Sequence, residues 1–219
     1  MYGAFDYQVI VRAAPLLWQG MELTLLLTFL AVLGGIVFGT LLALMRLSKY
    51  RPLSFFAGSY VNFFRSLPLI LVIFWFYLLV PKLLGRPIGG FYSVLIAFVL
   101  FEAAYYCEII RAGIQSITRG QIYAGMAIGL TYGQTMRYIV LPQAFRNMVP
   151  VLLTQAIILF QDTSLVYVVG LKDFLTTTEI IATRDHRVVE LFLFAAAVYL
   201  VLCVVGSTVV RKLQRKYAL

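Results

Sequence analysis

Long, almost continuous runs of apolar residues dominate the chain and are separated by shorter polar segments. A membrane-spanning helix needs roughly 20 predominantly apolar residues, and five stretches meet this requirement. They cover about residues 20–45, 55–80, 91–110, 149–169 and 188–210. A membrane β-barrel would need segments of about ten residues that alternate in polarity. The pattern therefore predicts an all-α integral membrane protein, with one transmembrane domain over residues 1–219 and about five helices.

The second of these stretches is interrupted by a charge and a proline. Arg65 and Pro68 lie inside the apolar run 55–80, and proline removes a helical hydrogen bond. The region is either one broken helix or an interfacial helix followed by a shorter span. We favour the broken helix.

Charge is distributed unevenly between the connecting segments. Of all residues, 62% are hydrophobic and 12% charged, and the formal net charge is +9. Basic residues gather, without acidic residues beyond the helix ends, after the first, third and fifth stretches. They are Arg46, Lys49, Arg51, Arg111, Arg119, Arg137, Arg146, Arg211, Lys212, Arg215 and Lys216. Such segments stay in the cytoplasm, so we expect the N-terminus outside and the C-terminus inside. The net charge then reflects topology, and nucleic-acid binding is not needed to explain it.

Few residues suit metal binding or covalent chemistry. Cys107 and Cys203 lie far apart in apolar runs, and His186 is the single histidine, in a polar loop. No metal site is expected from this spacing. The apolar stretches also lack a nucleophile with an adjacent base, which argues against a membrane enzyme.

Two glycines in the first stretch form a small-residue face. Gly35 and Gly39 are four residues apart, the spacing at which another helix can approach closely. The partner is either a helix of the same chain or a second subunit.

The connection between the third and fourth stretches, about residues 112–148, is far longer than the two to eight residues usual between packed helices. We expect short helices there, separated by Gly120, Gly129, Gly133 and Pro142. Apolar residues such as Ile122, Met126 and Ile128 recur at helical spacing. Exposed apolar residues indicate a docking surface for another protein. An amphipathic helix lying on the bilayer surface is the alternative.

Residues 120–144 resemble the cytoplasmic loop shared by permease subunits of bacterial ATP-binding-cassette importers. That loop has an EAA triplet, a later glycine and the sequence I-x-L-P. Ala124, Gly129, Ile139, Leu141 and Pro142 occupy the matching positions. The triplet itself departs from the pattern, because residues 123 and 125 are Tyr and Gly where the family usually has Glu and Ala.

The resemblance extends over nearly the whole chain. Residues 64–69, 108–114 and 161–165 are similar to the polar amino acid permeases, and FEAAYYCEIIRAGIQSITRGQ and LFQDTSLVYV are most similar to glutamate/aspartate import permeases. It implies a multi-pass protein of the bacterial inner membrane, with a second permease subunit of the same or a related kind. It also implies a cytoplasmic ATPase dimer and a periplasmic amino-acid-binding protein.

No cofactor is expected in this chain. It has no G-x-x-x-x-G-K-[ST] sequence to hold a nucleotide phosphate, so ATP-Mg would be bound and hydrolysed by the partner ATPase. The coupling segment is expected to dock on that partner. Its candidate residues are Gln121, Tyr123, Ala124, Gly125, Met126, Gly129 and Leu130.

Ionisable residues within apolar stretches are costly and usually face a cavity or a partner. The candidate substrate-pathway residues are Arg65, Glu102, Gln161, Asp162, Thr163 and Ser164. The guanidinium of Arg65 suits a carboxylate; a structural ion pair with Glu102 or Asp162 is the alternative. Residues 161–164 would otherwise form a polar cap at a helix break. Glu108 and Arg111, three residues apart, are interpreted as a local ion pair.

These observations predict the permease subunit of an ATP-driven importer for a polar amino acid, with glutamate or aspartate as the expected substrate. A stand-alone secondary carrier or channel is the alternative. The long patterned loop and the absence of internal repeats argue against it.

Overall fold

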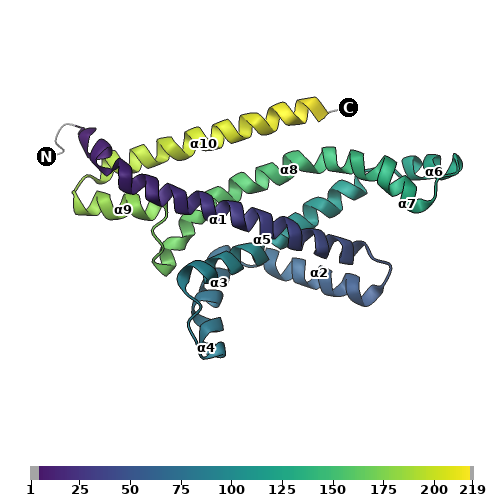
Figure 1. Cartoon of the computed structure of the whole chain (residues 1–219), viewed down its shortest axis with the longest axis horizontal. Coiled ribbons are helices and arrows are strands. Elements are labelled where there is room, and N and C mark those ends of the chain that lie inside the picture. Colours follow the sequence, from purple (N-terminus) through teal and green to yellow (C-terminus); the bar gives the residue numbers. More distant parts are fainter. Residues whose placement is uncertain (1–4, 218–219) are drawn as a thin grey trace.

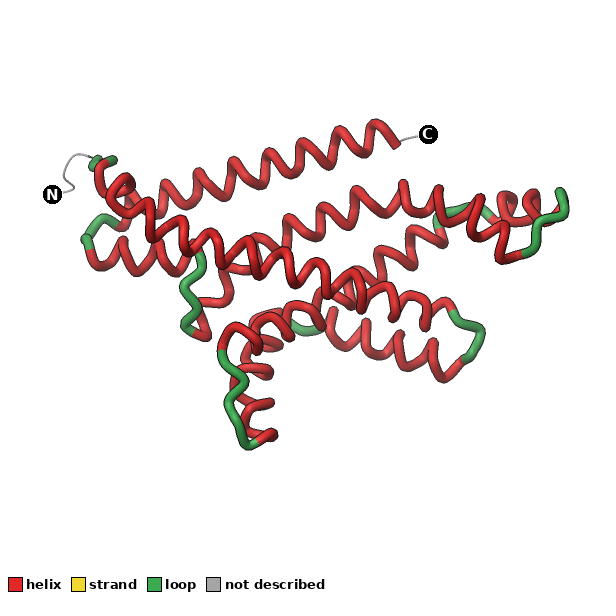
Figure 2. The backbone as a smooth tube through the Cα atoms, in the orientation of Figure 1, coloured by secondary structure: helices red, strands yellow, loops and turns green. Residues whose placement is uncertain are grey.

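The computed structural model describes residues 5–217, and all regular structure in that range is helical (Figures 1 and 2). The first half contains α1 (Gln8–Leu47), α2 (Arg51–Arg65), α3 (Leu69–Phe74), the π-helical turn η1 (Trp75–Leu79), α4 (Val80–Leu84) and α5 (Gly90–Gln115). The second half contains α6 (Arg119–Ala127), α7 (Tyr132–Thr135), the π-helical turn η2 (Met136–Val140), α8 (Leu141–Asp162), the 3-10 segment η3 (Thr163–Val169), α9 (Phe174–Arg184) and α10 (Val188–Tyr217).

The described part of the chain has four helices long and apolar enough to cross a membrane, or five if the bent pair α2 and α3–α4 counts as one span. This confirms the predicted fold class. Helices α1 and α10 are longer than the apolar runs that predicted them. At 1.5 Å per residue, the 40 residues of α1 extend about 60 Å, roughly twice the thickness of the hydrocarbon core.

The predicted interruption near Pro68 is a sharp bend. The axes of α2 and of the following helical segment differ by 104°, and Pro68 has extended backbone angles of φ −64° and ψ 135°. Proline has no N–H to continue the helix and also disfavours helical geometry in the preceding residue. As a result the α3–α4 segment projects away from the other helices (Figure 1).

Helix α5 lies at the centre and packs most closely against α1. A Cβ atom added to Gly39 would lie 2.7 Å from the Cβ of Tyr106 and 2.9 Å from the backbone nitrogen of Cys107. One added to Gly35 would lie 3.0 Å from the Cβ of Glu102. The glycine face of the sequence therefore packs within the subunit.

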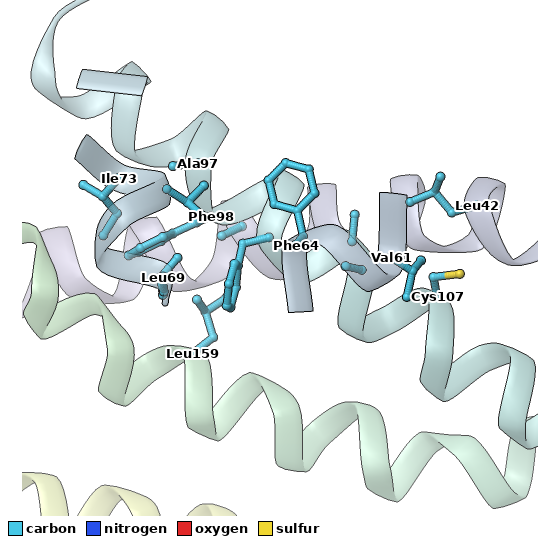
Figure 3. Packing of buried hydrophobic residues seen from close by; sticks show 14 of the residues in the cluster. Leu42, Val61, Phe64, Leu69, Ile73, Ala97, Phe98, Cys107 and Leu159 are labelled. Atoms are coloured by element: carbon cyan, nitrogen blue, oxygen red, sulfur yellow. The ribbon is translucent and has the colours of Figure 1, made fainter. Parts of the chain in front are cut away.

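An apolar cluster holds α1, α2, α3, α5 and α8 together (Figure 3). Its fully buried members include Leu27, Val61, Ile73, Phe98 and Leu159, one from each of these helices. Burial of side chains of this size contributes about 1.5–3 kcal/mol each in water. Within a bilayer, close packing of the same groups provides most of the stabilisation.

Two of the connections expected from the sequence differ in the structure. The segment 112–148 contains short helices, as expected, but α5 continues to Gln115 and α8 begins at Leu141, so the connection is shorter than expected. The polar stretch before α10 contains α9, which the apolar pattern did not predict. Asp173 caps α9 by accepting hydrogen bonds from the N–H groups of Leu175 (3.1 Å) and Thr176 (3.0 Å).

The basic segments lie together in space. The C-terminal ends of α1, α5 and α10 and the α6–α7 segment lie at one end of the molecule, and α9 lies at the opposite end (Figure 1). Residues from separate loops that were expected on one side of the membrane therefore share one end of the fold. The side of the membrane on which this end lies stays a prediction.

Candidate substrate cavity and coupling segment

A cavity of about 410 Å³ lies between the end of α2, the second half of α5 and the part of α8 from Asn147 to Gln155. The second half of α5 is the half nearer the α6 end of the molecule (Figure 1). The polar and charged residues that line the cavity are Arg65, Tyr105, Glu108, Ser116, Asn147 and Gln155. A mostly apolar pocket with a few polar groups is typical of a site for a small molecule.

Arg65 is the last residue of α2, directly before the bend. Its guanidinium carbon lies 5.5 Å from the ring centre of Tyr105, as a cation–π contact. Among residues 5–217, Arg65 forms no ion pair with a carboxylate. The alternative of a structural pair with Glu102 or Asp162 is therefore not found, and the guanidinium remains available in the cavity wall.

Glu102 lies directly behind the cavity. Its side chain is fully buried, and Oε1 accepts a hydrogen bond of 3.1 Å from Nε2 of Gln155. Gln155 itself lines the cavity. The structure thus links Glu102 to the site through Gln155.

The other four candidate pathway residues, 161–164, lie outside this cavity. Gln161 is exposed and its Nε2 donates to Sγ of Cys203 on α10 at 3.2 Å. Thr163 is buried and its hydroxyl donates to the carbonyl of Phe160 at 2.7 Å. This bond lies where α8 ends and η3 begins, as expected of a polar cap at a helix break. Asp162 and Ser164 are partly buried at the same junction.

Sequence reasoning missed Tyr105, Asn147 and Gln155 as cavity residues. One signal was present for the first: Glu102, Tyr105 and Glu108 recur every three residues, which places them along one side of α5. Asn147 and Gln155 carry no charge, and only the packing of α8 against α5 shows that they lie in a cavity wall.

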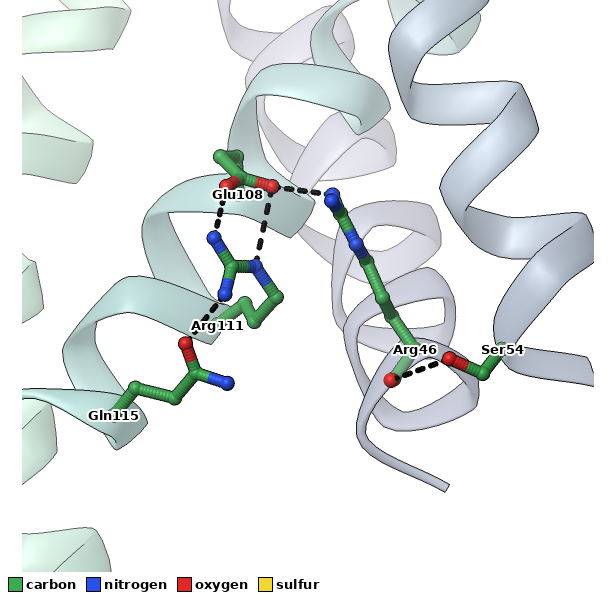
Figure 4. Close-up of polar contacts among 5 residues, drawn as sticks. All are labelled: Arg46, Ser54, Glu108, Arg111 and Gln115. Carbon is green, nitrogen blue, oxygen red and sulfur yellow. Dashed lines mark hydrogen bonds and ion pairs between the residues drawn. The ribbon is translucent and has the colours of Figure 1, made fainter. Parts of the chain in front are cut away.

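Glu108 on α5 is paired with two arginines, one on the same helix and one on α1 (Figure 4). The predicted pair with Arg111 is confirmed, and Arg46 at the end of α1 contacts the same carboxylate. Arg111 also donates to the side-chain oxygen of Gln115. Two guanidiniums on one carboxylate leave this end of the cavity with a net positive charge, which favours an anion nearby.

The candidate coupling segment is built on α6, whose C-terminus has Schellman geometry. The N–H of Gly129 donates to the carbonyl of Met126 (3.0 Å) and the N–H of Leu130 to the carbonyl of Gly125 (3.1 Å). Gly129 has φ +90°, which favours glycine. Of the α6 residues, Gln121, Tyr123, Ala124 and Met126 are at least partly exposed, so the helix presents a mixed polar and apolar face at one end of the molecule.

Packing explains why position 125 is glycine. Gly125 is buried, and a Cβ there would lie 2.7 Å from Cγ2 of Thr135 and 2.9 Å from Cδ1 of Ile139. An alanine would collide with the end of α7 and with η2. The departure from the family pattern thus allows α6 to lie against its neighbour.

Comparisons with known proteins agree with this architecture. Residues 35–219 match the model of the family described as binding-protein-dependent transport system inner membrane component. The chain is 52% identical to the glutamate/aspartate import permease protein GltK of Escherichia coli O6:H1, over 98% of this chain and 99% of the relative. It is 33% identical to the arginine transport system permease protein ArtQ of Bacillus subtilis, over 95% and 97%.

A solved structure has the same fold. The crystal structure of an amino acid ABC transporter with histidines contains a chain that superposes with a TM-score of 0.91 at 33% identity, covering 98% of this chain and 100% of that chain. A component of a binding-protein-dependent system works with separate subunits, which argues against a stand-alone carrier. The chain therefore belongs to the inner-membrane components of binding-protein-dependent transport systems, as a multi-pass permease subunit.

Proposed function

We propose that the chain forms the translocation pathway of an ATP-driven importer for acidic amino acids, glutamate and aspartate. The observation that carries the proposal is the guanidinium of Arg65, which lines the cavity and has no carboxylate partner in residues 5–217. The 52% identity to a glutamate/aspartate import permease supports the choice of substrate.

Arg65 binds a carboxylate of the substrate in this proposal. Its planar fork donates two parallel hydrogen bonds to one carboxylate, which gives both strength and orientation. The ring of Tyr105 keeps the guanidinium in place from one side. The cluster of Arg46 and Arg111 around Glu108 adds positive potential on the α6 side of the cavity, which favours an anionic substrate.

Energy for transport comes from a partner. A cytoplasmic ATPase dimer hydrolyses ATP-Mg and docks on the coupling segment, through residues from Gln121 to Leu130. Helix α6 packs through Gly125 against Thr135 and Ile139, and α7, η2 and α8 follow one another without a break. Closure of the ATPases therefore moves α8 as a rigid body relative to α5. The cavity lies between these two helices, so such a movement changes its width.

Two further partners complete the proposal. A second permease subunit, identical or related, pairs with this one, and a periplasmic amino-acid-binding protein delivers the substrate at the end that carries α9. In this orientation the N-terminus is outside and the C-terminus inside, as the basic residues predict.

Reconstitution tests the proposed function. The permease is placed in proteoliposomes with its ATPase and receptor, and uptake of radiolabelled glutamate, aspartate, glutamine and arginine is measured with and without internal ATP. We expect ATP-dependent uptake of the two acidic amino acids in preference to the others. Uptake that ignores ATP, or that favours arginine, would contradict the proposal.

A further inference from the structure

Gln155 contributes an uncharged amide to the wall of the cavity. On the side away from the cavity this amide is hydrogen-bonded to the buried Glu102. Nε2 of Gln155 donates to Oε1 of Glu102 at 3.1 Å, and Glu102 is 0% exposed. The second carboxyl oxygen of Glu102 has no hydrogen-bond partner within residues 5–217. A buried acid whose one bond is to a cavity residue is an unusual feature for a purely structural role.

The hydrogen bond to Glu102 determines which atom of the Gln155 amide is available to the cavity. An amide has a donor nitrogen and an acceptor oxygen, and the carboxyl oxygen of Glu102 selects the nitrogen. The carbonyl oxygen of Gln155 is then free to accept a hydrogen bond from a molecule in the cavity.

Gln155 and Arg65 contact α5 at neighbouring positions along the helix axis. On α5, Glu102 precedes Tyr105 by three residues, which is about 4.5 Å along the helix axis. Tyr105 carries the guanidinium of Arg65 on its ring, and Glu102 carries the amide of Gln155. An amino acid carries a carboxylate and an ammonium on the same carbon. The guanidinium of Arg65 suits the carboxylate, and the nearby carbonyl oxygen of Gln155 suits the ammonium.

Apart from the hydroxyl of Tyr105, whose ring already carries Arg65, the other polar groups of the cavity are engaged or lie farther away. The carboxylate of Glu108 is paired with Arg46 and Arg111. Asn147 donates to the hydroxyl of Ser116 at 3.0 Å and precedes Gln155 by eight residues, about 12 Å along α8. Gln155 is therefore the carbonyl acceptor best placed beside Arg65.

We propose that the carbonyl oxygen of Gln155 accepts a hydrogen bond from the α-ammonium of the transported amino acid, and that Glu102 is the positioning residue for this contact. The inference rests on the proposed function, in that the cavity holds an amino acid. It adds the residue that recognises the amino group.

Binding to the purified permease–ATPase complex in nanodiscs tests the contact without the receptor. The ligands are L-glutamate and glutarate, which is glutamate without its amino group. We expect Gln155→Met to weaken glutamate binding about 10-fold or more and to leave glutarate binding unchanged. Thr154→Val is the matched control, because Thr154 is adjacent on α8, bonds the carbonyl of Pro150 and does not line the cavity. An unchanged preference for glutamate in the Gln155 variant would overturn the inference.

A double-mutant cycle tests the role of Glu102. Glu102→Met is expected to weaken glutamate binding, and the double variant with Gln155→Met to be no worse than Gln155→Met alone, because both changes remove one contact. Glu102→Gln keeps an acceptor oxygen and is expected to retain binding. Additive losses would show that Glu102 does not act through Gln155.

Failure of the proposed function has a separate signature. If the wild-type complex binds and transports a neutral or basic amino acid in place of glutamate, the acidic-substrate proposal fails. The Gln155 experiment is then run with that amino acid and its deaminated analogue, because every amino acid carries the same ammonium, and its result still decides the inference. A complex that binds no amino acid overturns both.

Discussion

Replacement of Gly39 by alanine is expected to loosen the contact between α1 and α5. The new Cβ would lie 2.7 Å from the Cβ of Tyr106, 2.9 Å from the backbone nitrogen of Cys107 and 3.0 Å from the carbonyl oxygen of Ala103. None of these atoms can rotate away, so the helices must separate. Overpacking of this kind costs about 1–3 kcal/mol, whereas alanine gains about 1 kcal/mol in helix propensity. The net loss is up to about 2 kcal/mol, or up to about 8 °C in apparent Tm.

Gly58→Ala is the matched control. Gly58 is also helical, and a Cβ added there meets nothing within 4 Å. Only the propensity gain applies, so we expect a small rise in apparent Tm. Thermal unfolding of the purified variants, followed by tryptophan fluorescence, compares the two. If Gly39→Ala raised the apparent Tm as Gly58→Ala does, the close approach of α1 and α5 would be refuted.

Three further predictions concern coupling, topology and the ion pairs of α5. Gly129→Val forces a β-branched residue to φ +90° and is expected to reduce co-purification of the ATPase while the chain still inserts; full ATPase binding would contradict docking on α6. An impermeant thiol reagent should label a cysteine at His186 but not one at Lys212 in sealed cells, and the reverse would overturn the topology. Glu108→Gln leaves Arg46 and Arg111 without a carboxylate and is expected to lower stability by about 1–3 kcal/mol, which a thermal unfolding scan would detect.

The apolar pattern located the long helices well and the short ones poorly. A bilayer demands an uninterrupted run of apolar residues, so α1, α5 and α10 stand out in the sequence. Outside the hydrocarbon core helices need no such run. The segment Phe174–Arg184 mixes polar and apolar residues, and its helix is fixed by the cap at Asp173 and by packing against α1, where Thr24 accepts from the N–H of Phe174 at 3.1 Å.

The candidate site was predictable only where charge marked it. Arg65 stands out because a guanidinium in an apolar run is costly, and the structure places it in a cavity. Gln155 has no such signal, since uncharged polar residues are ordinary in helices. Its position depends on the packing of α5 against α8, two helices that are far apart in the sequence. Residues 161–164 were selected because Asp162 is ionisable and its neighbours are polar, and a local backbone bond accounts for Thr163.

Uptake per assembled complex for Arg65→Gln tests the central claim most directly. The variant is reconstituted with the ATPase and receptor, and glutamate uptake is divided by the amount of assembled complex, with Arg65→Lys alongside. If Arg65 binds the substrate carboxylate, Gln lowers the rate per complex about 10- to 100-fold at limiting substrate, and Lys restores only part because it lacks the bidentate fork. A normal rate per complex for Arg65→Gln would contradict the account.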